Sequence, residues 1–205
     1  MANQLLTVGH SVMESSAFLD ILRRFAIGLV VDVRSKPQSN RFPHFDQADL
    51  QKSLEAEKIR YLFMGEELGG RPDDPKAYRK DGLVDYRARR KSYSFQAGIE
   101  RVFNELAHDN LVLMCAEEDP LNCHRFLMIT PEIIALGVEP NHIRKGGILE
   151  TQKSAEDRLL QSQQWGAVIG ASLFSNDRDA ALENAYTAQA EKCAFRVDPR
   201  QIDPW

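Results

Sequence analysis

Five short apolar segments, separated by segments with helical spacing, constrain the fold of this chain more than any other feature. The apolar segments are residues 4–8, 29–33, 59–64, 111–115 and 138–143. Runs this short and this apolar are typical of strands that are covered on both faces, as in a parallel sheet. The alternation with helices predicts an α/β fold, with a mostly parallel, Rossmann-like sheet of about five strands flanked by helices.

The last quarter of the chain differs in character. Residues 153–205 combine a polar helical pattern, an apolar stretch at 165–174 and an alanine-rich helical pattern at 176–195. We therefore predict an α/β domain over residues 1–152 and a helical C-terminal extension over residues 153–205. The extension is expected to pack on the core or on a partner subunit, which makes oligomerisation through it part of the hypothesis.

Polar residues of catalytic types stand where the predicted strands end. In a parallel sheet the carboxyl ends of the strands lie at one edge, and ligands bind outside that edge. We therefore expect these side chains to converge on one pocket, together with a residue from the helix that follows the fourth predicted strand. The residues are His10, Asp32, Arg34, Cys115 and His124.

A second cysteine stands close to the end of the fourth predicted strand. The run 111–115 ends at Cys115, an acidic turn follows, and a helix is expected to begin near Cys123. A helix start carries unpaired N–H groups and partial positive charge, which would stabilise an anion or a thiolate there. His124 and Arg125 add hydrogen-bond donors to the same corner.

The two thiols admit three chemistries. In the first, one thiol acts as a nucleophile, with His124 or His10 as acid or base and with Asp32 orienting a histidine. In the second, the two thiols form a redox pair, which requires that the loop brings them together. In the third, the thiols bind zinc or iron with His124; because seven intervening residues are more than the usual zinc spacing, no metal ligand is assigned. A phosphate-binding loop would need an arginine a few residues after its nucleophilic cysteine. The spacing excludes such a loop, because Arg125 lies too far from Cys115 and too close to Cys123.

Basic residues gather in a chain that is acidic overall. The formal net charge is −4, yet residues 71–93 hold eight basic residues against four acidic ones. This distribution indicates a particular anionic ligand rather than nonspecific polyanion binding. Three tyrosines in the segment would allow it to act as a lid that stacks a base. The predicted substrate-binding residues are Arg34, Ser35, Arg41, Arg71 and Arg125.

Cysteine content and hydropathy indicate the compartment. Three cysteines fit a reducing compartment better than a disulfide framework. No apolar run approaches the length of a membrane span, and the N-terminus lacks the pattern of a secretory signal. The expectation is a cytoplasmic protein without a membrane partner.

Five motifs occur together in a fixed order along the chain. The motifs are Thr7-Val8-Gly9-His10-Ser11, Val31-Asp32-Val33-Arg34-Ser35-x-Pro37-x-Ser39, Leu68-Gly69-Gly70, Cys115-Ala116-Glu117 with Cys123-His124-Arg125, and His142-Ile143. Over about residues 4–150 this pattern resembles the bacterial domain of unknown function 488 family. The resemblance implies a compact α/β domain with the cysteine motifs at its site, and it implies no reaction. It also implies a further histidine where this chain has Thr151 or Gln152.

These observations favour an enzyme that acts on a phosphate-bearing substrate, either a nucleotide or a nucleic acid. Its reactive groups would come from Cys115, Cys123 and the histidines. Two alternatives remain open. The first is a metal- or redox-responsive thiol protein that uses Cys115, Cys123 and His124. The second is a noncatalytic interaction module that uses the basic segment and the extension.

Overall fold

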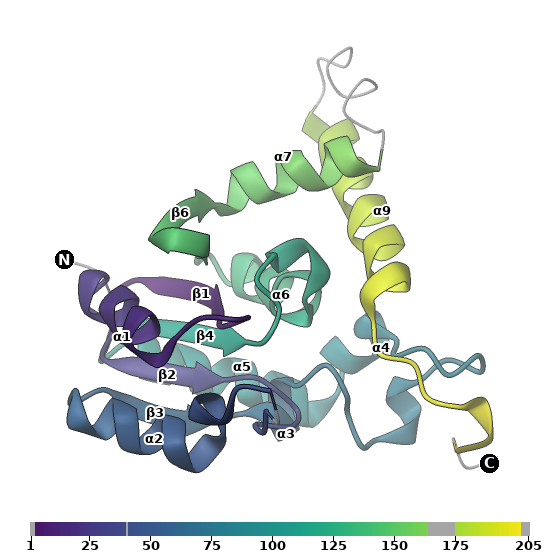
Figure 1. Ribbon diagram of the computed structural model, residues 1–205. Helices are drawn as coiled ribbons and strands as arrows, with labels where there is room; N and C mark the ends of the chain where they lie inside the picture. Colours follow the sequence, from purple (N-terminus) through teal and green to yellow (C-terminus); the bar gives the residue numbers. More distant parts are fainter. Residues whose placement is uncertain (1–2, 40, 164–174, 202–205) are drawn as a thin grey trace.

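The fold is organised by one sheet whose strands are short and whose central strands are apolar and buried. The computed structural model describes residues 3–39, 41–163 and 175–201. The sheet has the order β3-β2-β4-β1-β5-β6 (Figure 1). The parallel strands are β1 (Leu5–Gly9), β2 (Leu29–Asp32), β3 (Arg60–Phe63), β4 (Leu111–Cys115) and β5 (Asn141–Arg144). This confirms the predicted α/β class and the mostly parallel sheet.

A sixth strand was not predicted. Strand β6 (Ile148–Thr151) runs antiparallel to β5 at the edge of the sheet. Ile148 and Leu149 are exposed there, so the segment has no buried apolar face that a sequence pattern could reveal. Backbone hydrogen bonding to β5 is sufficient to hold so short an edge strand.

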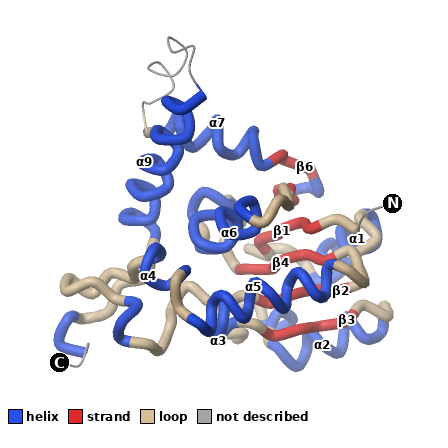
Figure 2. Tube along the Cα trace, turned by 180° about the vertical axis from the view of Figure 1, so that it is seen from behind, coloured by secondary structure: helices blue, strands red, loops and turns tan. Residues whose placement is uncertain are grey.

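Helices cover both faces of the sheet, as Figures 1 and 2 show from opposite sides. One face carries α1 (Ser15–Arg24) and α2 (Gln47–Ala56), and the other carries α5 (Tyr93–Leu106) and α6 (Thr130–Ala135). Successive strand residues alternate between the two layers. In β2, Val30 packs with α1 and α2, whereas Leu29 and Val31 pack with α5.

Shorter helical segments connect these layers. A π-helical turn at Arg125–Ile129 leads directly into α6. Short α-helices are α3 (Gly65–Leu68) and α4 (Tyr86–Arg90). Turns of 3-10 helix occupy Pro43–Phe45, Pro75–Ala77, Pro120–Asn122, Lys145–Gly147 and Pro199–Gln201. Within the described ranges, the helices lack the combination of length and apolar character that a membrane crossing requires.

In its described residues, the predicted C-terminal extension contains the helices α7 (Gln152–Ser162) and α9 (Ser175–Cys193). Helix α9 descends from α7 toward α4 in Figure 1 and buries Ala181 and Ala185 against the core. After α9 the chain pairs with the basic segment, where the Val84 amide donates to the Phe195 carbonyl at 3.0 Å. The predicted apolar stretch 165–174 lies outside the described residues.

A buried polar network joins the sheet to the extension. Arg125 Nε donates to the Thr7 hydroxyl at 3.3 Å, and this hydroxyl lies 2.8 Å from His142 Nδ1. The Thr7 oxygen accepts from Arg125, so its proton is directed to Nδ1, and His142 Nε2 donates to Gln152 Oε1 at 2.9 Å. The Gln152 amide in turn donates to the Tyr186 hydroxyl of α9 at 2.8 Å.

This network predicts a pH dependence of stability. Burial, together with the charge of Arg125, lowers the pKa of His142 to about 4. An unfolded chain protonates this histidine below about pH 6.5, whereas the folded chain resists protonation until about pH 4. The free energy of unfolding should therefore fall as the pH falls from 6.5 to 4, by up to about 3 kcal/mol from this residue.

Urea unfolding at a series of pH values measures this slope. His142→Gln cannot titrate, so its free energy of unfolding should depend less steeply on pH over the same range. Equal slopes for the two proteins would contradict the assignment.

Candidate functional site

The candidate site lies where the chain connections diverge at the carboxyl edge of the sheet. Neighbouring strands β1 and β4 are followed by helices on opposite faces, α1 on one and the π-helical turn with α6 on the other. Such a divergence opens a crevice beyond the strand ends, which is the usual ligand site in this kind of sheet. The two strand exits are joined there by backbone hydrogen bonds, such as that from the His10 amide to the Cys115 carbonyl at 2.9 Å.

A cavity of about 420 Å³ occupies this position. Seven of the ten residues predicted for the site line it, namely His10, Arg34, Ser35, Arg71, Cys115, Cys123 and His124. The other three are placed differently. Asp32 is buried behind Arg34, Arg125 is buried beneath the loop that follows β4, and Arg41 is exposed beside Phe42.

Two thiols and one imidazole form the innermost group. His124 Nδ1 lies 3.8 Å from the sulfur of Cys115 and 3.8 Å from the sulfur of Cys123. His124 Nε2 donates to the Val33 carbonyl at 2.9 Å, which directs Nδ1 toward the two thiols. Glu117 Oε2 accepts from the Cys115 thiol at 3.0 Å. Both cysteines are buried and form no disulfide.

The loop after β4 is fixed so that one of its three acidic side chains faces the thiols. Glu118 accepts two hydrogen bonds from Arg144, each 3.0 Å long. Asp119 accepts two from Arg158 of α7, each 2.8 Å long. Glu117 is the acidic side chain of this loop that contacts the thiols, through its hydrogen bond with Cys115. The resemblance motif Cys115-Ala116-Glu117 already contained this residue, although it was not predicted as a site residue.

The Arg125 guanidinium holds the backbone of the loop that follows β4. It is fully buried and donates to the carbonyls of Glu117 and Glu118. These hydrogen bonds and the one to Thr7 occupy it, so it does not reach into the cavity. Its predicted role as a substrate-binding residue is therefore not supported by its position.

Arg34 and Asp32 form a buried ion pair at the back of the cavity. Arg34 Nε and Nη2 donate to the two oxygens of Asp32 at 2.9 and 2.6 Å. The Tyr61 hydroxyl donates to the same carboxylate at 2.8 Å. Burial and the negative charge of Asp32 raise the pKa of Tyr61. Asp32 therefore orients Arg34. The sequence-based prediction that Asp32 orients a histidine is not supported by this position.

His10 is held neutral by its surroundings. It stacks on Phe45 with ring centroids 4.1 Å apart, and Nδ1 lies 3.1 Å from the Ser11 carbonyl. Nε2 lies 3.3 Å from Arg34 Nη1 and can only accept from it. Burial and the charge of Arg34 lower the pKa of His10 to about 4. With its lone pair engaged, His10 positions Arg34 rather than serving as a base.

The two thiols differ in their tendency to ionise. Hydrogen bonding with Cys123, together with burial, raises the pKa of Cys115. Burial also opposes ionisation of Cys123, but hydrogen bonding with Cys115 and the charges of Arg125 and His124 outweigh it and lower the pKa of Cys123. Negative charge in the pair is therefore favoured on Cys123, at the start of the helix.

The outer wall of the cavity includes residues that the sequence did not reveal. Phe195 and Cys193 come from the extension, and Tyr86 comes from α4. The Arg71 guanidinium lies 4.6 Å above the centre of the Phe195 ring. The extension thus contributes to the site, although it lies beyond the region of family resemblance and carries no motif that would announce this role.

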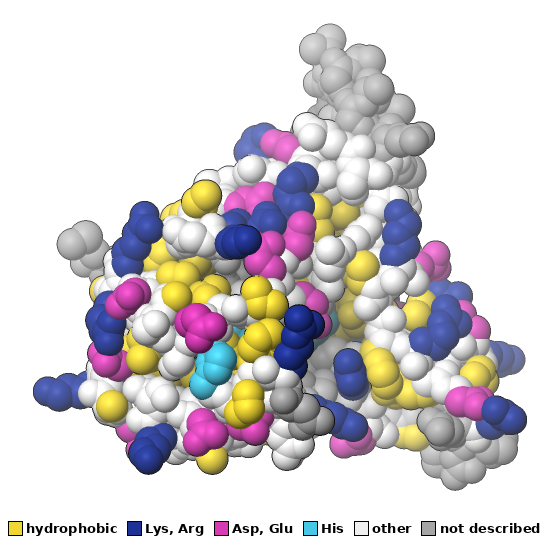
Figure 3. All heavy atoms as spheres, in the orientation of Figure 1, with side chains coloured by type: hydrophobic (Ala, Val, Ile, Leu, Met, Phe, Trp, Pro, Cys, Tyr) yellow, Lys and Arg dark blue, Asp and Glu magenta, His cyan; other side chains and the backbone are white. Residues whose placement is uncertain are grey.

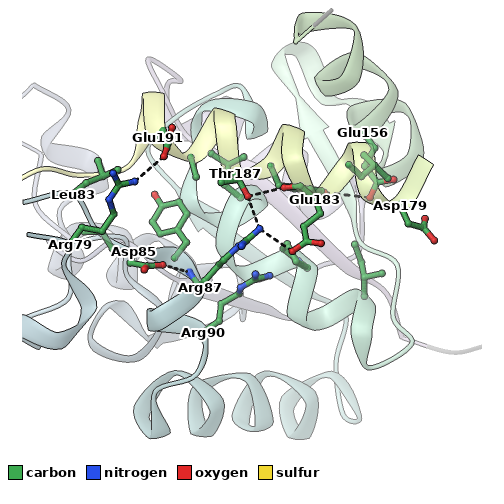
Figure 4. Close-up of a pocket in the computed structure, with 18 of the residues that line it drawn as sticks. Arg79, Leu83, Asp85, Arg87, Arg90, Glu156, Asp179, Glu183, Thr187 and Glu191 are labelled. Atoms are coloured by element: carbon green, nitrogen blue, oxygen red, sulfur yellow. Dashed lines mark hydrogen bonds and ion pairs between the residues drawn. The ribbon is translucent and has the colours of Figure 1, made fainter. Parts of the chain in front are cut away.

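Part of the basic segment 71–93 is paired with the extension rather than free for an anionic ligand. Arg79 pairs with Glu191 at 2.9 Å and Arg87 pairs with Glu183 at 2.9 Å, both on α9 (Figure 4). The cavity of about 620 Å³ between these elements contains no cysteine or histidine in its lining. Figure 3 shows basic and acidic side chains interspersed on the face that it presents. Of the basic residues in the segment, Arg71 lines the cavity that contains the thiols.

Fold and site together define an α/β protein with a cysteine- and histidine-containing pocket at the divergence point of a parallel sheet. A sequence model described as domain of unknown function DUF488 matches residues 14–130, so the chain belongs to this family. No curated protein matches the chain.

One solved structure is similar at low identity, a candidate phosphatase (DUF442) from Shewanella putrefaciens CN-32. The identity is 11% and the TM-score 0.36, over 95% of this chain and 91% of that chain. A likeness of this extent leaves the function to be argued from the chain's own residues.

The buried ion pair predicts a large cost for losing Arg34. Arg34→Ala leaves the Asp32 carboxylate, which has no exposed surface, without its cation. Breaking a buried pair in this way typically costs about 3 to 5 kcal/mol. Urea unfolding should show a loss of this size.

Arg23→Ala is the matched control, because Arg23 forms exposed pairs with Asp20 and Glu57. Its loss should cost less than about 1 kcal/mol. Similar losses for both variants would show that the Asp32–Arg34 pair is not the strong constraint described above.

Proposed function

We propose that the protein is an enzyme that acts on a phosphate-bearing substrate, a nucleotide or a nucleic acid, bound in the 420 Å³ cavity. One observation carries the proposal. The cavity combines a buried cluster of two thiols and an imidazole with two cationic side chains, Lys36 and Arg71, that form no ion pair within the described part of the chain. Reactive groups and anion-binding groups thus face the same space.

The anion-binding groups lie on the loop after β2 and on Arg71. The Arg71 amide donates to the Ser35 Oγ at 2.9 Å, which leaves the hydroxyl proton of Ser35 available to a ligand. The guanidinium of Arg71 stacks on Phe195, and a stacked guanidinium keeps its in-plane N–H groups free for a phosphate. Arg34 contributes less, since Asp32 neutralises its charge.

The reactive groups line the same cavity. Cys123 stands at the start of the helix, where the Arg125 amide donates to its sulfur at 3.5 Å. His124 Nδ1 lies close enough to both thiols to exchange a proton with either. A substrate whose phosphate contacts Arg71 and Lys36 would place its neighbouring bonds toward Cys123 and His124. Asp32 and His10 act only by holding Arg34.

The proposal predicts that nucleotides raise the melting temperature and that Arg71→Ala weakens this effect. Loss of one charge-assisted hydrogen bond to phosphate, worth about 1.5 to 3 kcal/mol, should weaken binding at least tenfold. Thermal shift titrations with a panel of nucleotides, short oligonucleotides and inorganic phosphate provide the measurement.

Arg79→Ala provides the control, because Arg79 belongs to the same segment but pairs with Glu191 outside the thiol-containing cavity. Ligand binding by this variant should match the wild type. If no phosphate-bearing compound stabilises the wild type, the proposed substrate class is wrong.

A further inference from the structure

We propose that Cys115, Cys123, His124 and Glu117 bind one zinc ion. Each offers one ligand atom, and these four atoms all lie within 4.8 Å of one another. The metal site rests on geometry alone, whereas any use of the metal in catalysis rests on the proposed function.

The distances fit a common ion. Zinc lies about 2.3 Å from thiolate sulfur and about 2.0 to 2.1 Å from imidazole nitrogen, so a tetrahedral site places sulfur and nitrogen about 3.6 Å apart. The observed separation is 3.8 Å from His124 Nδ1 to each of the two sulfur atoms. One ion between these three atoms therefore requires only a small adjustment. The ligand set of two sulfurs and one nitrogen is the one that favours zinc over magnesium or calcium.

The imidazole of His124 is oriented as a metal ligand. Metal-bound histidines almost always donate their second ring N–H to a carbonyl or carboxylate, which fixes the ring. His124 Nε2 donates to the Val33 carbonyl at 2.9 Å, so Nδ1 is presented to the thiols. Gly70 lies against the same side chain, where an added Cβ would come within 2.9 to 3.1 Å of three His124 atoms, Cγ, Nδ1 and Cβ. The ring is therefore held from two sides.

A buried positive charge near the thiols supports thiolate ligands. Arg125 is fully buried, and within the described residues it forms no ion pair. Its guanidinium donates only to neutral oxygens, those of the Glu117 and Glu118 carbonyls and the Thr7 hydroxyl. A buried cation without a counter-charge is costly. Two thiolates and the Glu117 carboxylate carry three negative charges, one more than Zn²⁺ neutralises, so the zinc-bound cluster would supply that counter-charge.

The site is open on one side. All four residues line the cavity, and Glu117 is exposed, whereas the two cysteines are buried. Structural zinc sites are closed by four buried ligands, and catalytic sites keep three protein ligands and an exchangeable fourth position. Cys115, Cys123 and His124 would form the fixed set, and Glu117 would hold the position that faces the cavity.

The ligand spacing explains why the sequence did not favour a metal. Short zinc motifs bring two cysteines together within one tight turn. Here the end of β4 and the start of the following helix bring together two cysteines with seven residues between them, because the loop is anchored to Arg125, Arg144 and Arg158. The convergence is a property of the sheet rather than of a local motif.

The test measures metal content in the full-length chain. Protein produced in zinc-supplemented medium and kept reduced should contain one zinc per chain by elemental analysis. Titration of metal-free protein with Co²⁺ should produce a thiolate charge-transfer band. Cys115→Ser and Cys123→Ser should each bind Zn²⁺ at least tenfold more weakly and lose intensity in that band.

Cys193→Ser is the matched control. Cys193 is the third cysteine of the chain and lines the same cavity, but it is not among the four clustered ligands. This variant should retain full metal content and the full Co²⁺ band. Equal loss in all three cysteine variants would overturn the proposed ligand set, as would a reduced wild type that binds neither Zn²⁺ nor Co²⁺.

Two further variants keep the test decisive if the thiol variants do not fold. Glu117→Gln changes an exposed residue and should alter the Co²⁺ spectrum. Gly70→Ala crowds the His124 ring and should weaken Zn²⁺ binding about tenfold. If neither variant changes spectrum or affinity, the metal site is wrong.

The two proposals fail separately. Zinc bound without any stabilisation by nucleotides or phosphate would support the metal site and contradict the substrate class. Nucleotide binding by a wild type that takes up no metal would support the substrate class and contradict the metal site.

Discussion

The buried Arg125 guanidinium is the contact on which the site depends. It joins the centre of β1, through Thr7, to the carbonyls of the loop after β4, and its own backbone begins the helix that carries His124. Two thiols that are distant along the chain become neighbours because this loop cannot open without leaving a buried cation unsolvated. The same Thr7 hydroxyl continues to His142 and Gln152, so the loop, the sheet and α7 share one network.

The parallel sheet could be predicted because its strands are buried on both faces. Segments such as residues 29–33 and 111–115 have no polar face, and this property distinguishes them from the helices around them. β6 could not be predicted in this way. Its apolar residues Ile148 and Leu149 are exposed, and the strand forms because β5 offers an unpaired edge. Pairing of that kind depends on a neighbour and leaves no pattern in the strand itself.

The candidate site could be predicted in outline because strand ends meet at one edge. His10, Arg34, Cys115 and His124 do lie together, as their positions after predicted strands implied. Their partners could not be read from the sequence. Arg125 was predicted to bind a ligand because it stands near a cysteine at a helix start. In the structure its side chain is fully buried and binds backbone carbonyls instead. The difference between an arginine that binds substrate and one that binds carbonyls lies in the path of the loop, which sequence spacing does not give.

The predicted boundary at residue 152 lies beyond the matched family region, which ends at residue 130, and residues after this boundary line the candidate site. Helix α9 neutralises Arg79 and Arg87, so the basic segment is bound to the extension before any ligand arrives. The segment after α9 then places Phe195 beneath Arg71 at the outer wall of the cavity. The extension thus pairs with Arg79 and Arg87 of the basic segment, and it leaves Arg71 stacked on Phe195 at the cavity. The cationic side chains that line the cavity are therefore positioned in part by residues that lie outside the matched family region.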